Sequence, residues 1–242
     1  MRLPRLAIRP APRAAILLLA AGLLVAAADP APPDPEPGKG AIGVSLRGWS
    51  PGGADRLEAV EVRFVRADRG DGPYLSNDLI ESNYAGKDGR VYLLNAEPGE
   101  YAAVAFRTRG GSLFAVRDKQ WLFHEKKLID ATTVTVHAGA LSFAGDYGVG
   151  GTIWRGGAED MREGNPYAAD ESQVHYLALM FPEAEGKSTL ARIYGSHPVY
   201  LATLLERKTR RDAEAEAEFR RKAAAKDFQK LPSWEAVVDT AP

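Results

Sequence analysis

The chain has 242 residues, with 31 Lys and Arg against 32 Asp and Glu, and therefore a formal net charge of −1 at pH 7. This balance provides no long-range positive field, so nucleic acid is excluded as an expected partner. The chain contains no cysteine, which excludes disulfide bonds, thiol chemistry and a lipid-modified cysteine.

Residues 1–28 have the layout of a secretory signal peptide. Arginines near the N-terminus precede an apolar run over 14–28, which ends in Ala26-Ala27-Ala28, an A-x-A cleavage site. The alternative is a retained membrane anchor, but the run is shorter than the roughly 20 apolar residues that a spanning helix needs. We therefore expect cleavage after Ala28 and a periplasmic or secreted protein, with the membrane as a partner only if the leader is retained.

Residues 29–40 (DPAPPDPEPGKG) form a proline-rich linker. Proline at this density favours an extended polyproline conformation over a packed helix or strand. We expect this linker to be the disordered N-terminus of the mature chain. If the leader were retained, the linker would act as a spacer between the membrane and the folded domain.

Residues 41–151 have the pattern of an all-β domain. Apolar residues alternate with other residues in short runs separated by Gly, Asp and Pro, which is typical of a sandwich or a barrel. The clearest runs contain Ile42, Val44 and Leu46, and then Val60, Val62 and Phe64. Further runs cover residues 90–95, 100–109, 112–116, 132–139 and 140–150, whereas 66–83 is expected to include a long loop. We predict a mainly β fold in which 41–151 form an antiparallel, immunoglobulin-like or prealbumin-like β-sandwich.

The remaining residues divide into two parts. Residues 152–197 predict a loop-rich connection with one short apolar element, 175–181, which is either a last strand or a buried helical turn. Residues 198–242 predict a C-terminal helical extension. Its helix is expected over 198–230, which are rich in Ala, Leu, Glu, Lys and Arg and contain no internal Gly or Pro.

The predicted C-terminal helix has an uneven apolar face. Its first turns, 200–205, supply apolar side chains, but beyond Arg207 such residues are sparse among charges. The first half is therefore expected to dock on the β domain, and the second half to project or pack loosely. We expect Pro232 to end the helix, after which the chain folds back through Trp234, Val237 and Val238.

One segment imitates a nucleotide-binding loop. The apolar run 175–181 is followed by Gly186-Lys187-Ser188-Thr189, as in a P-loop. That motif requires a glycine five residues before Gly186, where this chain has Phe181. Glu183 and Glu185 would also repel a phosphate group. We therefore predict that the chain binds no nucleotide.

The histidines do not indicate a metal site or a catalytic site. His124-Glu125 begins like the zinc-protease helix motif, but Leu128 stands where the second histidine is required. Ser196 is adjacent to a histidine, which does not supply the geometry of a nucleophile and its base. No ligand spacing relates the histidines, which are His124, His137, His175 and His197. The sequence thus predicts no catalytic residue, no metal ligand and no cofactor.

Two alternative functions depend on how residues converge in space. A hydrolase would use carboxylates from the long loops, with Asp78, Glu81, Asp160 and Glu163 as candidates. A carbohydrate-binding module would use a row of aromatic side chains drawn from Trp49, Tyr74, Trp121, Trp154 and Tyr167, tested first at Trp121 and Trp154. We expect instead that these aromatic residues cap the core or anchor loops.

The segment 86–106 contains two alternating runs joined by the turn Glu97-Pro98-Gly99-Glu100. Pro98 suits the second position of a type II turn, and Gly99 suits the positive φ of the third. Asp88-Gly89 is a second turn signal, which opens the first of the two strands. We expect Tyr101 to cover the corner, with its hydroxyl bonded to nearby backbone.

These residues resemble the carboxypeptidase regulatory-like, or transthyretin-like (prealbumin-like), β-sandwich domain. In that family a D-G turn, an alternating strand, a P-G-x-Y turn and another alternating strand follow one another. The matching residues are Asp88, Gly89, Val91, Leu93, Pro98, Gly99 and Tyr101, with Val104 and Phe106 continuing the pattern. The resemblance implies an accessory module of exported bacterial proteins, in which the corner residues carry no catalysis.

We therefore predict a non-enzymatic, exported protein of the cell envelope that acts as a binding or assembly module. Its expected partner is another envelope protein or a cell-wall component, contacted through the charged C-terminal helix.

Overall fold

The computed structural model describes residues 31–49, 56–70, 72–109, 120–153, 169–181 and 199–240. The predicted signal peptide (1–28), the strand expected at 112–116 and the P-loop-like residues 186–189 lie outside these ranges. Within them the chain is mainly β, as the alternating pattern predicted.

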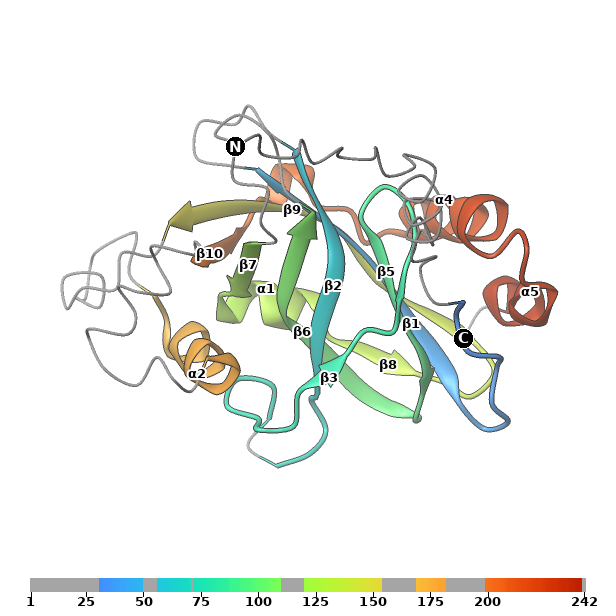
Figure 1. The fold of residues 1–242 in the computed structure, drawn as a ribbon, viewed down its shortest axis with the longest axis horizontal. Helices are drawn as coiled ribbons and strands as arrows, with labels where there is room; N and C mark the ends of the chain where they lie inside the picture. Colours follow the sequence, from blue (N-terminus) through green and yellow to red (C-terminus); the bar gives the residue numbers. More distant parts are fainter. Residues whose placement is uncertain are drawn as a thin grey trace, which may run out of the picture. The chain divides into compact units, whose positions relative to one another are not determined.

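Six of the described strands form one sheet that closes on itself (Figure 1). Around the closed path they are β1 (Gly40–Trp49), β2 (Arg56–Arg66), β6 (Gly99–Arg109), β7 (Gln120–His124), β10 (Val199–Leu204) and β9 (Leu141–Ile153), which pairs with β1 again. The pairs β1–β9 and β7–β10 are parallel, and the other four are antiparallel. The described strands therefore form a closed mixed barrel, and the antiparallel sandwich predicted from the sequence is not confirmed. Alternation reveals that a segment is a strand but not which strand lies beside it.

Shorter elements surround the barrel. β3 (Ile80–Glu81) pairs with β2, β5 (Arg90–Ala96) with β1, β4 (Tyr84–Ala85) with β5, and β8 (Val134–Val136) with β6. The helical elements are α1 (Lys126–Thr132), α2 (Glu171–Met180), η4 (Glu206–Lys208), α4 (Ala213–Lys222), the π-helical turn η5 (Ala223–Asp227) and α5 (Pro232–Asp239). α2 packs beside β7, whereas α4 and α5 pack beside β9.

The barrel interior is filled by alternate side chains of its strands. Ile42, Val44 and Leu46 are fully buried in this core, which confirms the predicted face of β1. On β2, a bulge directly after Ala59 shifts the register, so Ala59 lines the core in place of the expected Val60. A bulge inserts one unpaired residue and thus reverses the side-chain alternation locally.

A second core lies between the outer face of the barrel and the C-terminal helices. Phe219, Phe228 and Trp234 pack there with Tyr92 and Phe143. The ring centroids of Phe143 and Phe219 are 4.8 Å apart, and those of Tyr92 and Phe228 are 4.9 Å apart. The prediction that the second half of the extension projects or packs loosely is therefore wrong. Its few aromatic residues are the ones that face the sheet, and the many charged residues cover the other side.

The helix predicted from Pro198 is wrong over Val199–Leu204, which form strand β10. This strand lies between β7 and β9 and completes the barrel, with Ala202 inside it and Leu201 in a third core on its outer face. A six-residue apolar run fits either a helix or a strand, and the two neighbouring strands decide between them.

The helical part of the extension starts later than predicted. α4 starts after Asp212, whose side chain accepts a hydrogen bond from the backbone N–H of Ala215 at 2.7 Å. Pro232 occupies the first turn of α5, so it starts a helix rather than ending one. Trp234 and Val238 are buried, which confirms that the chain folds back after Pro232.

The apolar element at 175–181 is helical. It belongs to α2, whose first turn is closed by a reciprocal capping box between Asp170 and Gln173. Tyr176 and Leu177 of this helix are buried against Phe123 and the outer face of β10.

In the segment 86–106 the Asp88-Gly89 turn has the expected backbone, whereas the type II turn expected at Pro98-Gly99 is instead a bend that leads directly into β6. Asp88 and Gly89 both have positive φ, 58° and 76°, and the N–H of Arg90 donates to the carbonyl of Lys87 at 3.2 Å. Gly99 has φ 144°, and a Cβ atom there would lie 2.1 Å from Nη2 of Arg66.

Tyr101 forms the predicted corner. Its buried hydroxyl donates to the carbonyl oxygen of Glu97 at 2.9 Å and accepts from Nη1 of Arg66 at 3.2 Å. The guanidinium of Arg66 also lies 4.9 Å from the centre of the Tyr101 ring.

Replacing Tyr101 by phenylalanine is expected to lower the free energy of unfolding by about 1–2 kcal/mol, because the carbonyl of Glu97 loses its donor. Urea denaturation followed by circular dichroism measures this change. Glu97→Ala is the control, since it keeps the accepting carbonyl and removes only an exposed side chain, for which we expect a change below about 0.5 kcal/mol. Equal losses in the two variants would contradict the role of the hydroxyl.

Candidate functional site

A cleft of about 330 Å³ lies on the outer face of the barrel, between β1, β5 and β9 on one side and α4 and η5 on the other. Basic side chains dominate its lining, and they are Arg47, Arg90, Arg210, Lys222 and Lys226. Its acidic side chains are Asp88, Asp146 and Glu218. Ser45, Ala215 and Phe219 complete the lining. We call this feature the charged cleft.

The barrel wall of the charged cleft follows from the alternation on β1. Val44 and Leu46 point into the barrel core, so Ser45 and Arg47 point outward into the cleft. Asp146 of β9 lies opposite Ser45 in the parallel ladder. The barrel core therefore fixes the position of the polar groups on its outer side.

The helical wall follows from the period of an α-helix. Ala215, Glu218, Phe219, Lys222 and Lys226 have the spacing of one helical face, although the last belongs to η5. The apolar members of this face contact the sheet, and the charged members line the cleft. The two walls are thus held together by the second core directly beneath them.

Each carboxylate of the charged cleft forms ion pairs with its basic side chains. Asp88 lies 3.1 Å from Nζ of Lys226 and 3.4 Å from Nη1 of Arg90. The bond from Lys226 is the main reason why the pKa of Asp88 is lowered. Asp146 pairs with Nη2 of Arg47.

Glu218 joins the two ends of the helical wall. Its carboxylate lies 2.5 Å from Nζ of Lys222 and 2.9 Å from Nη1 of Arg210. These two partners, Lys222 first, lower the pKa of Glu218 to about 2. The carboxylate therefore stays ionised under all ordinary conditions and holds both cations at the cleft.

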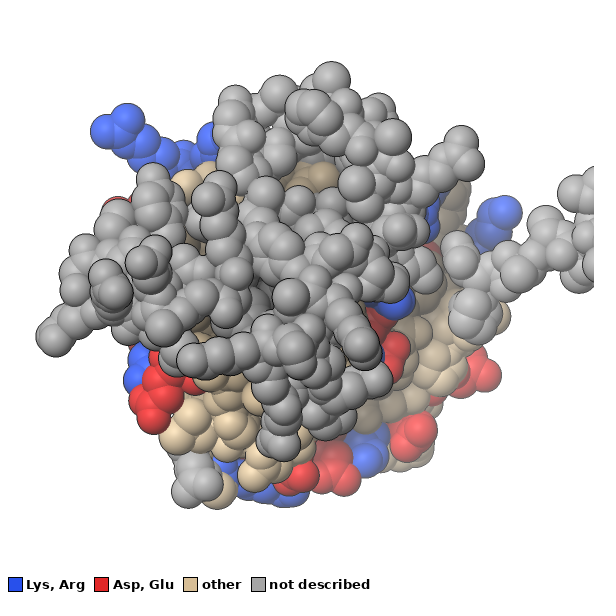
Figure 2. All heavy atoms as spheres, turned by 60° about the vertical axis from the view of Figure 1, so that its left-hand side comes forward, with Lys and Arg blue, Asp and Glu red and all other residues tan. Residues whose placement is uncertain are grey.

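The basic side chains that line the cleft outnumber the acidic ones by five to three. Two carboxylates outside the lining offset this excess, because Asp227 pairs with Arg90 and Glu214 lies 3.7 Å from Nη2 of Arg210. The whole chain, in contrast, has a net charge of −1. On another face, drawn in Figure 2, basic and acidic side chains are interspersed along the lower rim. The walls of the charged cleft therefore carry more basic than acidic side chains, and the balancing carboxylates lie outside its lining.

Asp227 anchors η5 to the hairpin that carries Arg90. Its carboxylate accepts from Nε of Arg90 at 2.6 Å, from the hydroxyl of Tyr92 at 2.6 Å and from the backbone N–H of Lys87 at 3.0 Å. A Cβ atom at residue 86 would lie 2.5 Å from this carboxylate, which explains the glycine there. The wall formed by Arg90 is therefore fixed in place before any ligand binds.

Burial by itself would lower the pKa of Arg90, but the hydrogen bonds and the charge of Asp227 outweigh it and raise the pKa. Burial and the same carboxylate raise the pKa of Tyr92 well above its usual value. Arg90 is thus charged and Tyr92 neutral at any ordinary pH.

The element that carries Asp227, η5, is a π-helical turn, and such turns are frequent at functional sites.

Of the carboxylates that the sequence suggested for a hydrolase, the two described ones, Asp78 and Glu81, do not line the charged cleft. Glu81 lies on the edge strand β3, with 56% of its side chain exposed, and pairs with Arg63 at 2.5 Å. Asp78 is exposed. Asp160 and Glu163 lie outside the described residues.

Arg63 also pairs with a buried carboxylate that was not predicted from the sequence. Glu61 lies 2.6 Å from Nη2 of Arg63 and also pairs with Arg107. Burial raises the pKa of Glu61 even though both arginines oppose this effect. No pattern in the sequence singles out Glu61, because the same strand also contains Glu58 and Arg63.

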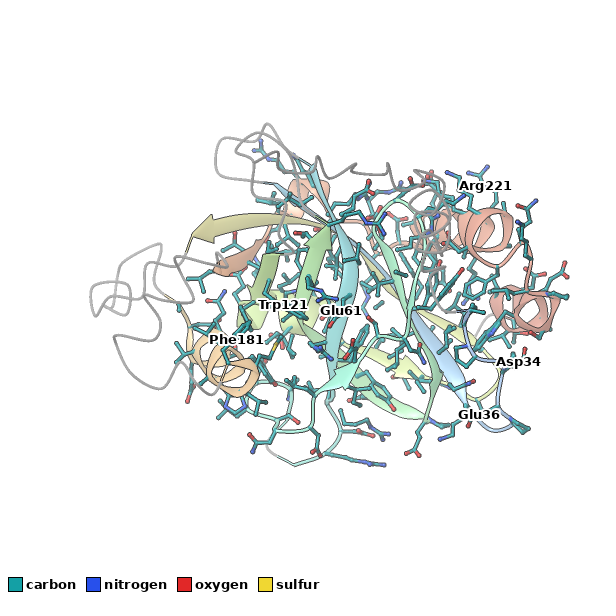
Figure 3. All side chains as sticks on the ribbon, in the orientation of Figure 1. Asp34, Glu36, Glu61, Trp121, Phe181 and Arg221 are labelled. Atoms are coloured by element: carbon teal, nitrogen blue, oxygen red, sulfur yellow. The ribbon has the colours of Figure 1, made fainter. Side chains whose placement is uncertain are left out.

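The aromatic candidates for carbohydrate binding are used within the protein where the structure describes them. Trp121, labelled in Figure 3, has the guanidinium carbons of Arg63 and Arg107 at 5.4 and 5.7 Å from its ring centre. The hydroxyl of Tyr74 donates to Asp130 at 2.5 Å. The side chain of Trp49, and residues Trp154 and Tyr167, lie outside the described parts.

The three described histidines lie in different environments. His124 is fully buried, and its Nδ1 lies 2.8 Å from the carbonyl oxygen of Ala103, so Nδ1 carries the proton and donates. His175 lies 3.1 Å from the carbonyl oxygen of Ser76, His137 is exposed, and His197 is not described. Among the described residues, no group of three or more His, Asp or Glu side chains is placed to hold a metal ion.

No family model matches this chain, and neither the curated proteins nor the solved structures include one with significant similarity to it. Within the part of the chain that the structure describes, no helix is both long enough and apolar enough to cross a membrane.

Proposed function

We propose that this chain is a non-enzymatic, exported envelope protein that binds a small organic anion in the charged cleft. The observation that carries the proposal is the excess of basic side chains around a volume of about 330 Å³. Guanidinium and ammonium groups are the usual partners of carboxylate and phosphate oxygens. The volume is that of a small-molecule site, at the lower end of the common range.

The walls of the charged cleft support a binding role. Arg90 and Phe219 are buried and belong to elements that the second core and Asp227 hold together. A site whose donors are fixed in advance loses less conformational entropy on binding. Lys222 and Arg210 are partly exposed, and their shared partner Glu218 holds both of them at the cleft.

The cellular location in this proposal is inferred from the sequence. The leader at 1–28 favours export, with a periplasmic or secreted location. The ligand would then be a soluble anion or an acidic group of another envelope protein or of the cell wall. The Asp88-Gly89 turn and the Tyr101 corner support the transthyretin-like resemblance, which stays a prediction, as does the sandwich.

Replacing Lys222 by glutamine is expected to weaken the binding of a carboxylated probe by about tenfold, or about 1.4 kcal/mol, since one charge-assisted bond is lost. Isothermal titration calorimetry with glucuronate and with citrate measures the affinity. Glucose is the neutral comparison, and inorganic phosphate tests the other class of anion.

Arg221→Gln is the matched control for Lys222→Gln. Arg221, labelled in Figure 3, is the neighbouring residue on α4, is exposed and does not line the charged cleft. We expect it to leave the affinity within about twofold of the unmodified chain. Equal effects of the two substitutions, or equal binding of glucose and glucuronate, would refute an anion site in the cleft.

A further inference from the structure

The proline-rich segment ahead of the barrel is not free along its whole length. Residues Pro32–Glu36, which we call the strap, lie against α5 and the end of β5, and Asp34 and Glu36 are labelled there in Figure 3. The expectation of a disordered linker is therefore wrong for the strap, because its backbone finds hydrogen-bond partners on the folded domain.

One side of the contact comes from the first turn of α5. The indole Nε1 of Trp234 donates to the carbonyl oxygen of Pro33 at 2.7 Å. The neighbouring Ser233 donates from its hydroxyl to Oδ1 of Asp34 at 3.1 Å. Trp234 is only 2% exposed, so the strap satisfies the polar group of an otherwise buried side chain.

The other side comes from a single amide. Nδ2 of Asn95 donates to the carbonyl oxygen of Asp34 at 2.8 Å, and Oδ1 of Asn95 accepts from the backbone N–H of Glu36 at 2.9 Å. Asn95 has a positive φ of 60°, which asparagine tolerates better than most residues. The side-chain amide of Asn95 therefore binds the main chain of Asp34 and of Glu36, the two residues that flank Pro35.

The exposure of the strap follows a period of three. Pro32 and Pro35 are half-buried, whereas Pro33, Asp34 and Glu36 are exposed. A polyproline II helix has three residues per turn, so every third residue meets the same surface. Aromatic side chains commonly recognise such segments in proteins, and the rigid proline backbone makes the binding inexpensive in entropy.

We propose that Asn95, Ser233 and Trp234 form a polyproline-binding site, and that a proline-rich, acidic segment of a partner protein binds there in exchange for the strap. The strap itself defines the chemistry of that segment, with prolines at the contacting positions and an acidic residue opposite Ser233. This site shares no residue with the charged cleft, so the proposal does not depend on the anion ligand.

The strap can be exchanged because few side chains attach it and most of its own residues are exposed. Its covalent link gives it an effective concentration on the order of millimolar, so a partner must compete with it. Weakening the strap should therefore reveal the site to a free peptide.

The test uses the full chain with Pro32, Pro33 and Pro35 replaced by alanine and Asp34 replaced by asparagine. Calorimetry then measures binding of the synthetic peptide PPDPEPG. We expect affinity at least about tenfold higher than for the unmodified chain, whose strap competes. Adding Trp234→Phe, which keeps an aromatic ring but removes the N–H donor, should lower the affinity by about tenfold.

A second variant guards against misfolding at the buried Trp234. Asn95→Asp in the strap-altered chain tolerates the positive φ and keeps an acceptor, but it removes the donor to the main chain. We expect it to weaken peptide binding by about tenfold. The proposal is overturned if the folded strap-altered chain does not bind PPDPEPG, or if it binds the peptide AADAEAG equally well.

Discussion

Replacing Asp227 by alanine is expected to lower the free energy of unfolding by about 3 kcal/mol, because the buried guanidinium of Arg90 then keeps only the more distant Asp88 as a counter-charge. The side chains of Arg90 and Asp227 are 3% and 0% exposed, so water cannot replace the lost partner. The hydroxyl of Tyr92 and the N–H of Lys87 lose their acceptor in the same variant. Chemical denaturation monitored by circular dichroism measures the loss.

Two further variants show whether the cause is the unpaired charge. Asp239→Ala removes an exposed carboxylate of α5, and we expect a change within about 0.5 kcal/mol. Arg90→Met combined with Asp227→Leu removes both charges and should recover part of the loss, since an apolar pair of similar volume often replaces a buried ion pair well. A loss below about 1 kcal/mol in Asp227→Ala would mean that the pair does not hold η5 to the barrel.

The stability of the folded chain is expected to fall as the pH is lowered from about 6.5 to about 4, and His124 is the main reason. Burial lowers the pKa of His124 from 6.5 to about 4, and the hydrogen bond to the carbonyl of Ala103 opposes this shift only in part. Between these values the unfolded chain binds a proton that the folded chain excludes. Protonation thus favours unfolding, and the contribution is full above pH 6.5 and lost by about pH 4.

The expected size of this effect is roughly 3 kcal/mol over the whole window, from about 1.4 kcal/mol per unit of pKa difference. His124→Asn keeps a donor near the position of Nδ1 and does not titrate, so its stability should depend less on pH by about this amount. His137→Asn, at an exposed position, should leave the pH dependence unchanged. Parallel curves for the unmodified chain and His124→Asn would exclude His124 as the source.

Much of the local structure could be predicted from the sequence, because short-range rules determine it. The alternation of Ile42, Val44 and Leu46 gave the inward face of β1, and Asp88-Gly89 gave a turn with two positive φ angles. The corner formed by Tyr101 was predicted for the same reason, since its partner lies only four residues away.

The predictions from the sequence are wrong where a segment fits either a helix or a strand, and where residues distant in the sequence determine its structure. Val199–Leu204 fits a helix or a strand, and pairing with β7 and β9 made it a strand. β7 and α1 were not predicted, because five- and seven-residue elements carry too short a periodic signal. The bulge after Ala59 likewise depends on the register with β6.

The candidate site shows the same division. Each residue of the charged cleft is visible in the sequence, and the face of α4 from Ala215 to Lys222 has a readable helical period. The sequence does not predict that Arg47, Arg90 and Lys226 surround one cleft. A local sequence pattern contains no information about which distant segments pack together.

The sequence by itself determined that this chain is mainly β, where its tight turns lie and which faces of its strands are apolar. These features follow from backbone dihedrals and from the burial of alternate side chains, which act within a few residues. Only the tertiary structure decided that the sheet closes through two parallel pairs, that the C-terminal helices cover the barrel, and that basic side chains from four strands and helices converge. Those outcomes depend on pairing and packing between distant segments, whose free energies are gained only when the whole chain folds.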